Sequence, residues 1–129
     1  MEVIALLKFQ RMSASKGQQL ARMIQGLPVA EALKIVEFSP RKAATLLHKT
    51  LKSAIANAQN NAKLPVDNLR VKEAAVLEGP RMKRYWPRSR GMVSPILKRL
   101  CHIKIVLTDE ANGRRSRNSQ PEKRAEKES

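Results

Sequence analysis

The sequence GPRMKRYWPRSRGMVSPILKRLCHIK, residues 79–104, is the stretch from which the fold of this chain can be worked out. It contains no acidic residue, and its basic residues are Arg81, Lys83, Arg84, Arg88, Arg90, Lys98, Arg99 and Lys104. Alternating runs at 69–72 and 103–107 flank it, a pattern typical of two strands joined by a long connector. The pattern predicts a hairpin whose far end leaves the globular body. Such an arm has too little apolar surface for its own core, so a polyanion is its natural environment.

The distribution of charge along the chain supports this interpretation. The formal net charge is +15 over 129 residues. Residues 1–78 carry 12 basic and 6 acidic residues, residues 79–108 carry 8 basic and none acidic, and residues 109–129 carry 6 basic and 5 acidic. More than half of the excess charge therefore lies on less than a quarter of the chain. A uniformly solvated basic surface is not concentrated in this way.

Length and composition indicate one domain with an aliphatic core. The chain is long enough for one domain and hardly for two. Its four aromatic residues are Phe9, Phe38, Tyr85 and Trp86. Cys101 is the single cysteine, so no internal disulfide can form. No apolar run approaches the roughly 20 residues that span a bilayer, and the first residues do not resemble a signal peptide, so neither a membrane nor secretion is expected.

Hydrophobic periodicity predicts a strand followed by three helices before the arm. Residues 2–12 alternate like a strand, and Ser13 or Ser15 can cap the helix that follows. The apolar stripes expected for the first two helices are Leu20, Met23, Ile24 and Leu27, then Val29, Ala32, Leu33 and Val36. Gly26 fits a C-terminal cap, and Pro28 lies where a new helix can begin.

The third helix is predicted to be the longest. Ser39 as N-cap and Pro40 at the first helical position indicate its start. Its apolar stripe comprises Ala44, Leu47, Leu51, Ala54, Ile55 and Ala58. Small residues in this stripe would let the helix pack closely on a sheet. With the two strands at the end of the chain, the expected fold class is α+β: three helices on one face of a three-stranded antiparallel sheet that carries a long β-hairpin arm.

The predicted domain organisation is a globular nucleic-acid-binding domain over residues 1–109, with the arm inserted at about 79–102, and a tail over residues 110–129. The tail contains Ala111 and Ala125 as its only apolar residues. It cannot bury surface and is expected to be disordered when free.

Four motifs in the sequence resemble a known family. They are residues 53–58 (SAIANA), 78–84 (EGPRMKR), 87–91 (PRSRG) and 96–103 (ILKRLCHI). In this order and spacing they resemble the bacterial ribosomal large-subunit protein twenty-two family over residues 2–109. Ser89, Met92 and the pair Leu100 and Cys101 depart from the usual family pattern. The loss of a basic residue at position 92 removes one expected phosphate contact.

The resemblance implies the same α+β fold and a structural, non-enzymatic role in the large ribosomal subunit. It implies that the protein binds ribosomal RNA, supports subunit assembly and lines the nascent-peptide exit tunnel with the hairpin tip. The tip residues are Pro87, Arg88, Ser89, Arg90 and Gly91. The implied partners are large-subunit ribosomal RNA, neighbouring ribosomal proteins and the nascent peptide, at one copy per ribosome in the bacterial cytoplasm.

The residues expected to bind RNA lie mainly on the arm. They are Arg81, Lys83, Arg84, Tyr85, Trp86, Arg88, Arg90, Lys98, Arg99, His102 and Lys104, with Lys16, Arg41 and Lys42 from the body. Arg and Lys form charge-assisted hydrogen bonds with phosphates, and Tyr85 and Trp86 can stack on bases. Two alternatives stay open: the two aromatic residues could fill a small core, and Lys42, Lys49 and Lys52 could form a solvated helix face.

No catalytic, metal or cofactor site is predicted. The spacing of Ser, His and Asp does not indicate a triad, and residues 79–80 do not form a phosphate-binding glycine loop. His48 and His102 are expected to be structural residues, and Cys101 a small packing residue. The alternative function is a free regulatory nucleic-acid-binding protein that uses the basic arm. An enzyme is disfavoured.

Overall fold

The computed structural model describes residues 1–109, so the predicted tail lies outside the described residues. Its main elements are β1 (Glu2–Gln10), α1 (Ala14–Ile24), α2 (Val29–Phe38), α3 (Lys42–Asn60), β2 (Arg70–Pro87) and β3 (Val93–Thr108). Two single-turn 3-10 helices, η1 (Val66–Asn68) and η2 (Ser89–Gly91), precede β2 and separate β2 from β3. The strands form one antiparallel sheet in the order β1-β3-β2.

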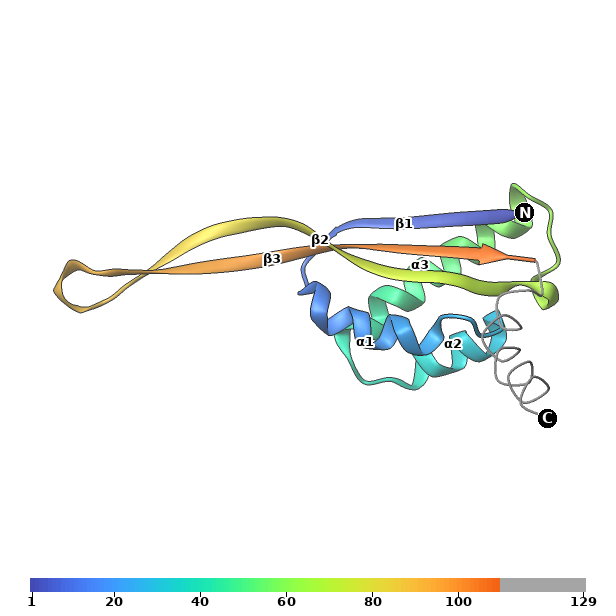
Figure 1. The fold of residues 1–129 in the computed structure, drawn as a ribbon, viewed down its shortest axis with the longest axis horizontal. Coiled ribbons are helices and arrows are strands. Elements are labelled where there is room, and N and C mark those ends of the chain that lie inside the picture. Colours follow the sequence, from blue (N-terminus) through green and yellow to red (C-terminus); the bar gives the residue numbers. More distant parts are fainter. Residues whose placement is uncertain (110–129) are drawn as a thin grey trace, which may run out of the picture.

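The arm is a continuation of two sheet strands. β1 pairs with β3 from Glu2 opposite Thr108 to Gln10 opposite Cys101. Beyond that point β3 keeps only β2 as a neighbour, and their pairing continues to Pro87 opposite Val93. Figure 1 shows the resulting two-stranded ribbon running far beyond the helices. A strand that belongs both to the body and to the arm therefore fixes where the arm leaves the domain.

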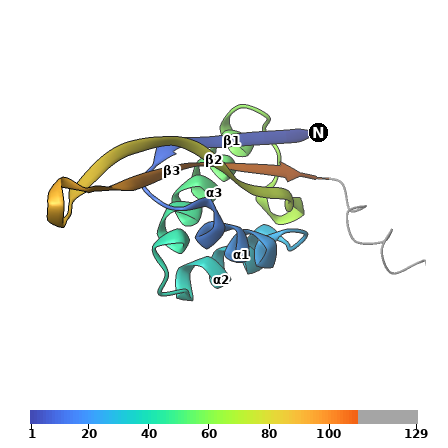
Figure 2. The same ribbon diagram turned by 60° about the vertical axis from the view of Figure 1, so that its left-hand side comes forward.

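The three helices cover one face of the sheet, as Figure 2 shows from a second direction. The inward side chains of β3 in the body are Ile103, Ile105 and Leu107, all fully buried. They belong to the same core cluster as Leu47 and Leu51 of α3. Ala44, Ala54 and Ala58 are also buried, which confirms the expectation that small residues let the long helix approach the sheet closely. The predicted α+β fold class is confirmed.

α1 packs closely on the sheet at a glycine that no sequence motif marks. A Cβ at Gly17 would lie 2.9 Å from Met12 Cε and 3.1 Å from Val76 Cγ2. A side chain at position 17 would therefore require Met12 and Val76 to shift. At the end of α1, Gly26 has φ +85°, as expected of a helix-terminating glycine, and its N–H donates to Val71 O at 2.7 Å.

Three local expectations are wrong. Met23 is 59% exposed, since its stripe on α1 is narrower than predicted. The first strand ends at Gln10 and not at residue 12. The third helix begins at Lys42 with Arg41 as its N-cap, whereas Ser39 closes α2. The loop between α2 and α3 must turn the chain back along the sheet, and that requirement overrides the local preference of Ser39 and Pro40 for a helix start.

No helix among the described residues is long and apolar enough to cross a membrane.

The face of the sheet opposite the helices carries partly exposed apolar side chains such as Ile4, Leu6 and Leu77. Stability must therefore come from the buried face.

We predict that the body folds without the outer arm. Among the described residues, no buried apolar side chain comes from 81–99, so replacing 81–99 with an Asn-Gly turn removes no core contact. Circular dichroism should show the same helical signal and one cooperative thermal transition. Loss of the helical signal or of cooperative melting would show that the arm contributes to the fold of the body.

We also predict a large difference between two Leu→Ala substitutions. Leu47 is fully buried under the sheet, whereas Leu6 is 55% exposed on the open face. Leu47→Ala should lower the free energy of unfolding by about 2–5 kcal/mol because it leaves a cavity. Leu6→Ala should cost well under about 1.5 kcal/mol, because the side chain is only partly removed from water. Urea unfolding of both variants gives the comparison; equal losses would contradict the described core.

Candidate nucleic-acid interface

Cations occupy both faces of the arm. Arg81 lies opposite Arg99 in the β2–β3 register, and Met82 lies opposite Lys98. Successive residues of a strand point to opposite faces, so Lys83 and Arg84 extend to different sides. All of these basic side chains are exposed. The arm therefore presents positive charge in all directions around its axis.

This charge is almost uncompensated within the protein. Within residues 1–109, the arm cation that forms an ion pair is Arg81, which lies 3.5 Å from Glu78, and both side chains are exposed. Like charges placed directly opposite each other, such as Arg81 and Arg99, destabilise a strand pair. An exposed pair with a single carboxylate offsets little of that repulsion. Anions from outside the protein are therefore needed to offset the repulsion between the arm cations. A phosphate backbone supplies such anions along its length.

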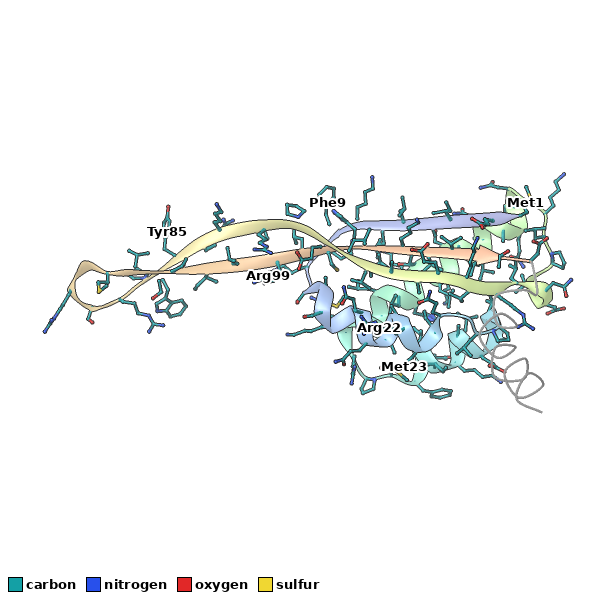
Figure 3. All side chains as sticks on the ribbon, in the orientation of Figure 1. Met1, Phe9, Arg22, Met23, Tyr85 and Arg99 are labelled. Carbon is teal, nitrogen blue, oxygen red and sulfur yellow. The ribbon has the colours of Figure 1, made fainter. Side chains whose placement is uncertain are left out.

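The two aromatic residues of the arm lie outside any core. Tyr85 is 80% exposed and Trp86 57% exposed, and as neighbours on β2 they point to opposite faces. Figure 3 shows Tyr85 extending into solvent far from the helices. The alternative that these residues fill a small core is therefore wrong for the described chain. Exposed rings flanked by cations are suited to stacking on nucleic-acid bases.

The arm ends in a tight turn. Arg88 N–H donates to Met92 O at 2.7 Å, and Arg90 and Gly91 have φ of +61° and +70°. Arg88 Nε also donates to Ser94 Oγ at 3.3 Å. A positive φ at Arg90 is uncommon for a residue with a side chain. The predicted tip residues 87–91 do lie at the far end of the arm, and their side chains are exposed.

His102 and Lys104 are not on the arm. Both lie where β3 runs through the body, paired with Leu77 and Ala75 of β2. His102 Nδ1 accepts a hydrogen bond from the Phe9 N–H at 3.0 Å, and the two rings meet edge to face at 4.9 Å. Lys104 Nζ lies 3.8 Å from Glu73 Oε2. The structure gives both residues partners within the protein and does not group them with the arm cations.

The predicted body residues Lys16, Arg41 and Lys42 do come together. They line a hollow of about 840 Å³ at the root of the arm, along with Arg11 and Arg99. Figure 3 shows Arg99 at this root, beside the start of α1. The sequence analysis does not single out Arg11, because it falls inside the strand predicted over residues 2–12, whereas β1 ends at Gln10 and leaves Arg11 in the loop before α1. Its positive charge was the only signal in the sequence.

The lysine stripe predicted on the long helix is divided by the structure. Lys42 is the first residue of α3 and faces the hollow. Lys49 and Lys52 lie further along α3, are exposed and do not line it. Only the first of the three lysines is therefore grouped with other predicted RNA-binding residues.

The potential metal ligands and the single cysteine of the described residues can be placed in the structure. No group of three or more His, Cys, Asp or Glu residues within residues 1–109 is arranged to hold a metal ion. Cys101 is fully buried. Burial raises the pKa of the Cys101 thiol, and the positive charge of Lys42 offsets part of that rise. The thiol is thus a packing group, as predicted, and a poor nucleophile.

Comparison with known proteins assigns the family. The sequence model described as "Ribosomal protein L22p/L17e" matches residues 5–108. The chain is 52% identical over 110 residues to the large ribosomal subunit protein uL22 of Akkermansia muciniphila, covering 85% of this chain and 98% of that protein. It is 48% identical over 110 residues to uL22 of a Thermotoga species, strain RQ2, covering 85% of this chain and 69% of that protein. A basic two-stranded arm on a small α+β body is thus accompanied by sequence similarity over nearly the whole described region, and the chain belongs to the ribosomal protein L22p/L17e family.

Proposed function

We propose that this protein is a structural, non-catalytic constituent of the large ribosomal subunit that binds ribosomal RNA through its arm and body. The observation that carries the proposal is the arm itself: a two-stranded ribbon with cations on both faces and no core. In water the exposed cations of such a ribbon form few stabilising interactions, whereas folded RNA surrounds the ribbon with phosphates that can pair with them. The names of the relatives, both large ribosomal subunit proteins, support the assignment.

The arm is long enough to cross a layer of folded RNA. From Gly79 to Pro87, β2 runs beyond the end of β1, and nine residues at about 3.3 Å each extend to about 30 Å. The resemblance of the arm motifs to the family supports placing the turn at residues 87–91 in the wall of the nascent-peptide exit tunnel. In this proposal the limbs contact phosphates and the tip faces the tunnel and the nascent peptide.

The proposed interface consists of the predicted arm residues and the body cations at its root. Arg81, Lys83, Arg84, Lys98 and Arg99 contact phosphates along the limbs. Tyr85 and Trp86 stack on bases, and Arg88 and Arg90 lie at the tip. His102 and Lys104 remain proposed contacts of the sheet beside the arm. Neighbouring ribosomal proteins are proposed as further partners, at one copy per ribosome.

Sedimentation of native lysate tests the function against the alternative of a free regulatory nucleic-acid-binding protein. A ribosomal constituent should sediment almost entirely with the large subunit, in a one-to-one ratio to it. A free regulator should remain largely at the top of the gradient. Detection of this chain mainly outside ribosomal fractions would contradict the proposal.

We predict that limb and tip substitutions have different effects. Lys83→Ala with Arg84→Ala removes two limb cations that face phosphates in the proposed complex, and should reduce incorporation into large subunits several-fold. Arg88→Ala with Arg90→Ala removes the same charge at the tip. It should leave incorporation nearly unchanged and alter macrolide sensitivity or the passage of stalling nascent chains.

Quantitative comparison of purified subunits and of drug response in the two strains provides the measurement. The tip variant is the matched control for the limb variant, since each loses two positive charges. If both block incorporation equally and neither changes drug response, the tunnel-wall placement is wrong.

We predict that RNA binding is steeply salt-dependent. Each phosphate neutralised by a cation releases counterions, so log affinity falls with log salt in proportion to the number of contacts. With the arm cations engaged, affinity for large-subunit RNA fragments should drop on the order of a thousandfold between about 50 and 200 mM salt. Filter binding over this range measures the slope. A nearly flat response would indicate that apolar contacts dominate.

A further inference from the structure

The hollow at the root of the arm has the chemistry of a binding site. Its volume of about 840 Å³ lies within the range of roughly 300–1,000 Å³ that is usual for ligand sites. Four parts of the fold form it: the β1–α1 loop, the first half of α1, the start of α3 and strand β3 of the arm. The lining residues are Arg11, Met12, Ser13, Lys16, Gln19, Arg41, Lys42, Ala43, Leu97 and Arg99.

Half of these residues are cations, and none is Asp or Glu. The hydrogen bonds that hold the cations together end on neutral oxygens. Arg11 Nη1 donates to Arg99 O at 3.4 Å, and Lys42 Nζ donates to Arg11 O at 2.7 Å. Arg41 Nη1 donates to Gln19 Oε1 at 3.1 Å. The side chains of Arg11, Arg41 and Lys42 are thus oriented by the protein, and no carboxylate lines the hollow to compensate their charges.

Two helix starts add to the positive potential of the hollow. α1 and α3 both begin there, with Ser13 and Arg41 as their N-caps. Neither N-cap side chain accepts a hydrogen bond from its helix, and Ser13 Oγ is bonded to Ser15 Oγ at 2.9 Å instead. Neither helix has an acidic residue in its first turn. Cations beside the positive ends of two helix dipoles are unfavourable until an anion joins them.

We propose that this hollow binds a backbone phosphate of RNA and thereby fixes the arm to the body. The inference rests on the proposed function and adds to it a specific site, whose occupant touches β3 and two helices at once. Arg and Lys side chains supply charge-assisted hydrogen bonds to phosphate oxygens, and the helix starts supply backbone N–H groups. Met12 and Leu97 provide an apolar wall for the attached sugar. The five cations around one hollow carry the proposal, and the helix starts strengthen it.

The test compares two double variants of the full chain with equal loss of charge. Lys16→Gln with Arg41→Gln removes one lysine and one arginine from the hollow. Arg22→Gln with Lys34→Gln removes one of each from exposed positions on α1 and α2 that do not line it. Arg22 lies further along α1, as Figure 3 shows. The unaltered chain and both variants are titrated with a single-stranded RNA pentanucleotide and, separately, with inorganic phosphate, and backbone amide NMR shifts are recorded.

We expect the RNA to shift amide signals of residues 11–19, 41–43 and 97–99 in the unaltered chain. The hollow variant should lose these shifts and bind the RNA at least tenfold more weakly, while the control variant loses less than threefold. Inorganic phosphate should shift the same signals but bind far more weakly than RNA. Equal weakening in both variants, RNA-induced shifts elsewhere only, or phosphate binding as tightly as the RNA would each overturn the proposal of an RNA phosphate site.

A separate readout distinguishes failure of this site from failure of the proposed function. Large-subunit incorporation of the unaltered chain tests the function alone. If the unaltered chain incorporates but the hollow variant binds RNA as well as the control variant does, the site is wrong and the function stands. Unchanged amide spectra of the free hollow variant, apart from the substituted positions and their neighbours, confirm that its fold is intact; in a variant that unfolds, Lys16→Gln alone replaces the pair.

Discussion

The antiparallel pairing of β2 with β3 is the interaction on which the rest of this structure depends. In the body the same pairing forms the sheet that the helices cover, and beyond Glu78 and Cys101 it continues as the backbone ladder of the arm. Backbone hydrogen bonds do not depend on side-chain type, so the ladder can continue where no apolar side chain is buried. That independence lets a basic ribbon extend from a domain with an ordinary core.

Stability and charge are separated along this one ladder. Inward side chains such as Ile105 and Leu107 hold the helices to the sheet, and the buried residues stop where the arm begins. From Arg81 onward the side chains contribute little to the fold, since Arg81 lies opposite Arg99 and a pair of like charges destabilises the strands that carry it. An isolated two-stranded ribbon is marginal in water, and external anions both neutralise it and order it. In the proposed complex, the RNA supplies the anions that the arm lacks within the protein.

Much of the fold could be predicted because its signals are local and periodic. The long helix stripe through Leu47 and Leu51 and the alternation through Ile103 and Ile105 each specify an element and its buried face. The errors arose where tertiary packing overrides local preference. The sequence around Ser39 and Pro40 favours a helix start, yet α3 begins at Lys42. Met23 fits a helical stripe but is exposed, because the face of α1 that packs in the core runs through Gly17, Leu20, Ala21 and Ile24.

The sequence by itself determined the fold class, the basic arm and the family motifs, because charge and periodicity are properties of consecutive residues. Only the tertiary structure decided which cations act together. Arg11, Arg41 and Arg99 are separated by tens of residues, and they meet because the β1–α1 loop, the start of α3 and β3 converge at the root of the arm. The tertiary structure also decided that His102 accepts a hydrogen bond from the Phe9 N–H and that Lys104 pairs with Glu73. Spacing along a chain cannot show such groupings, since strand register and helix placement depend on contacts between distant segments.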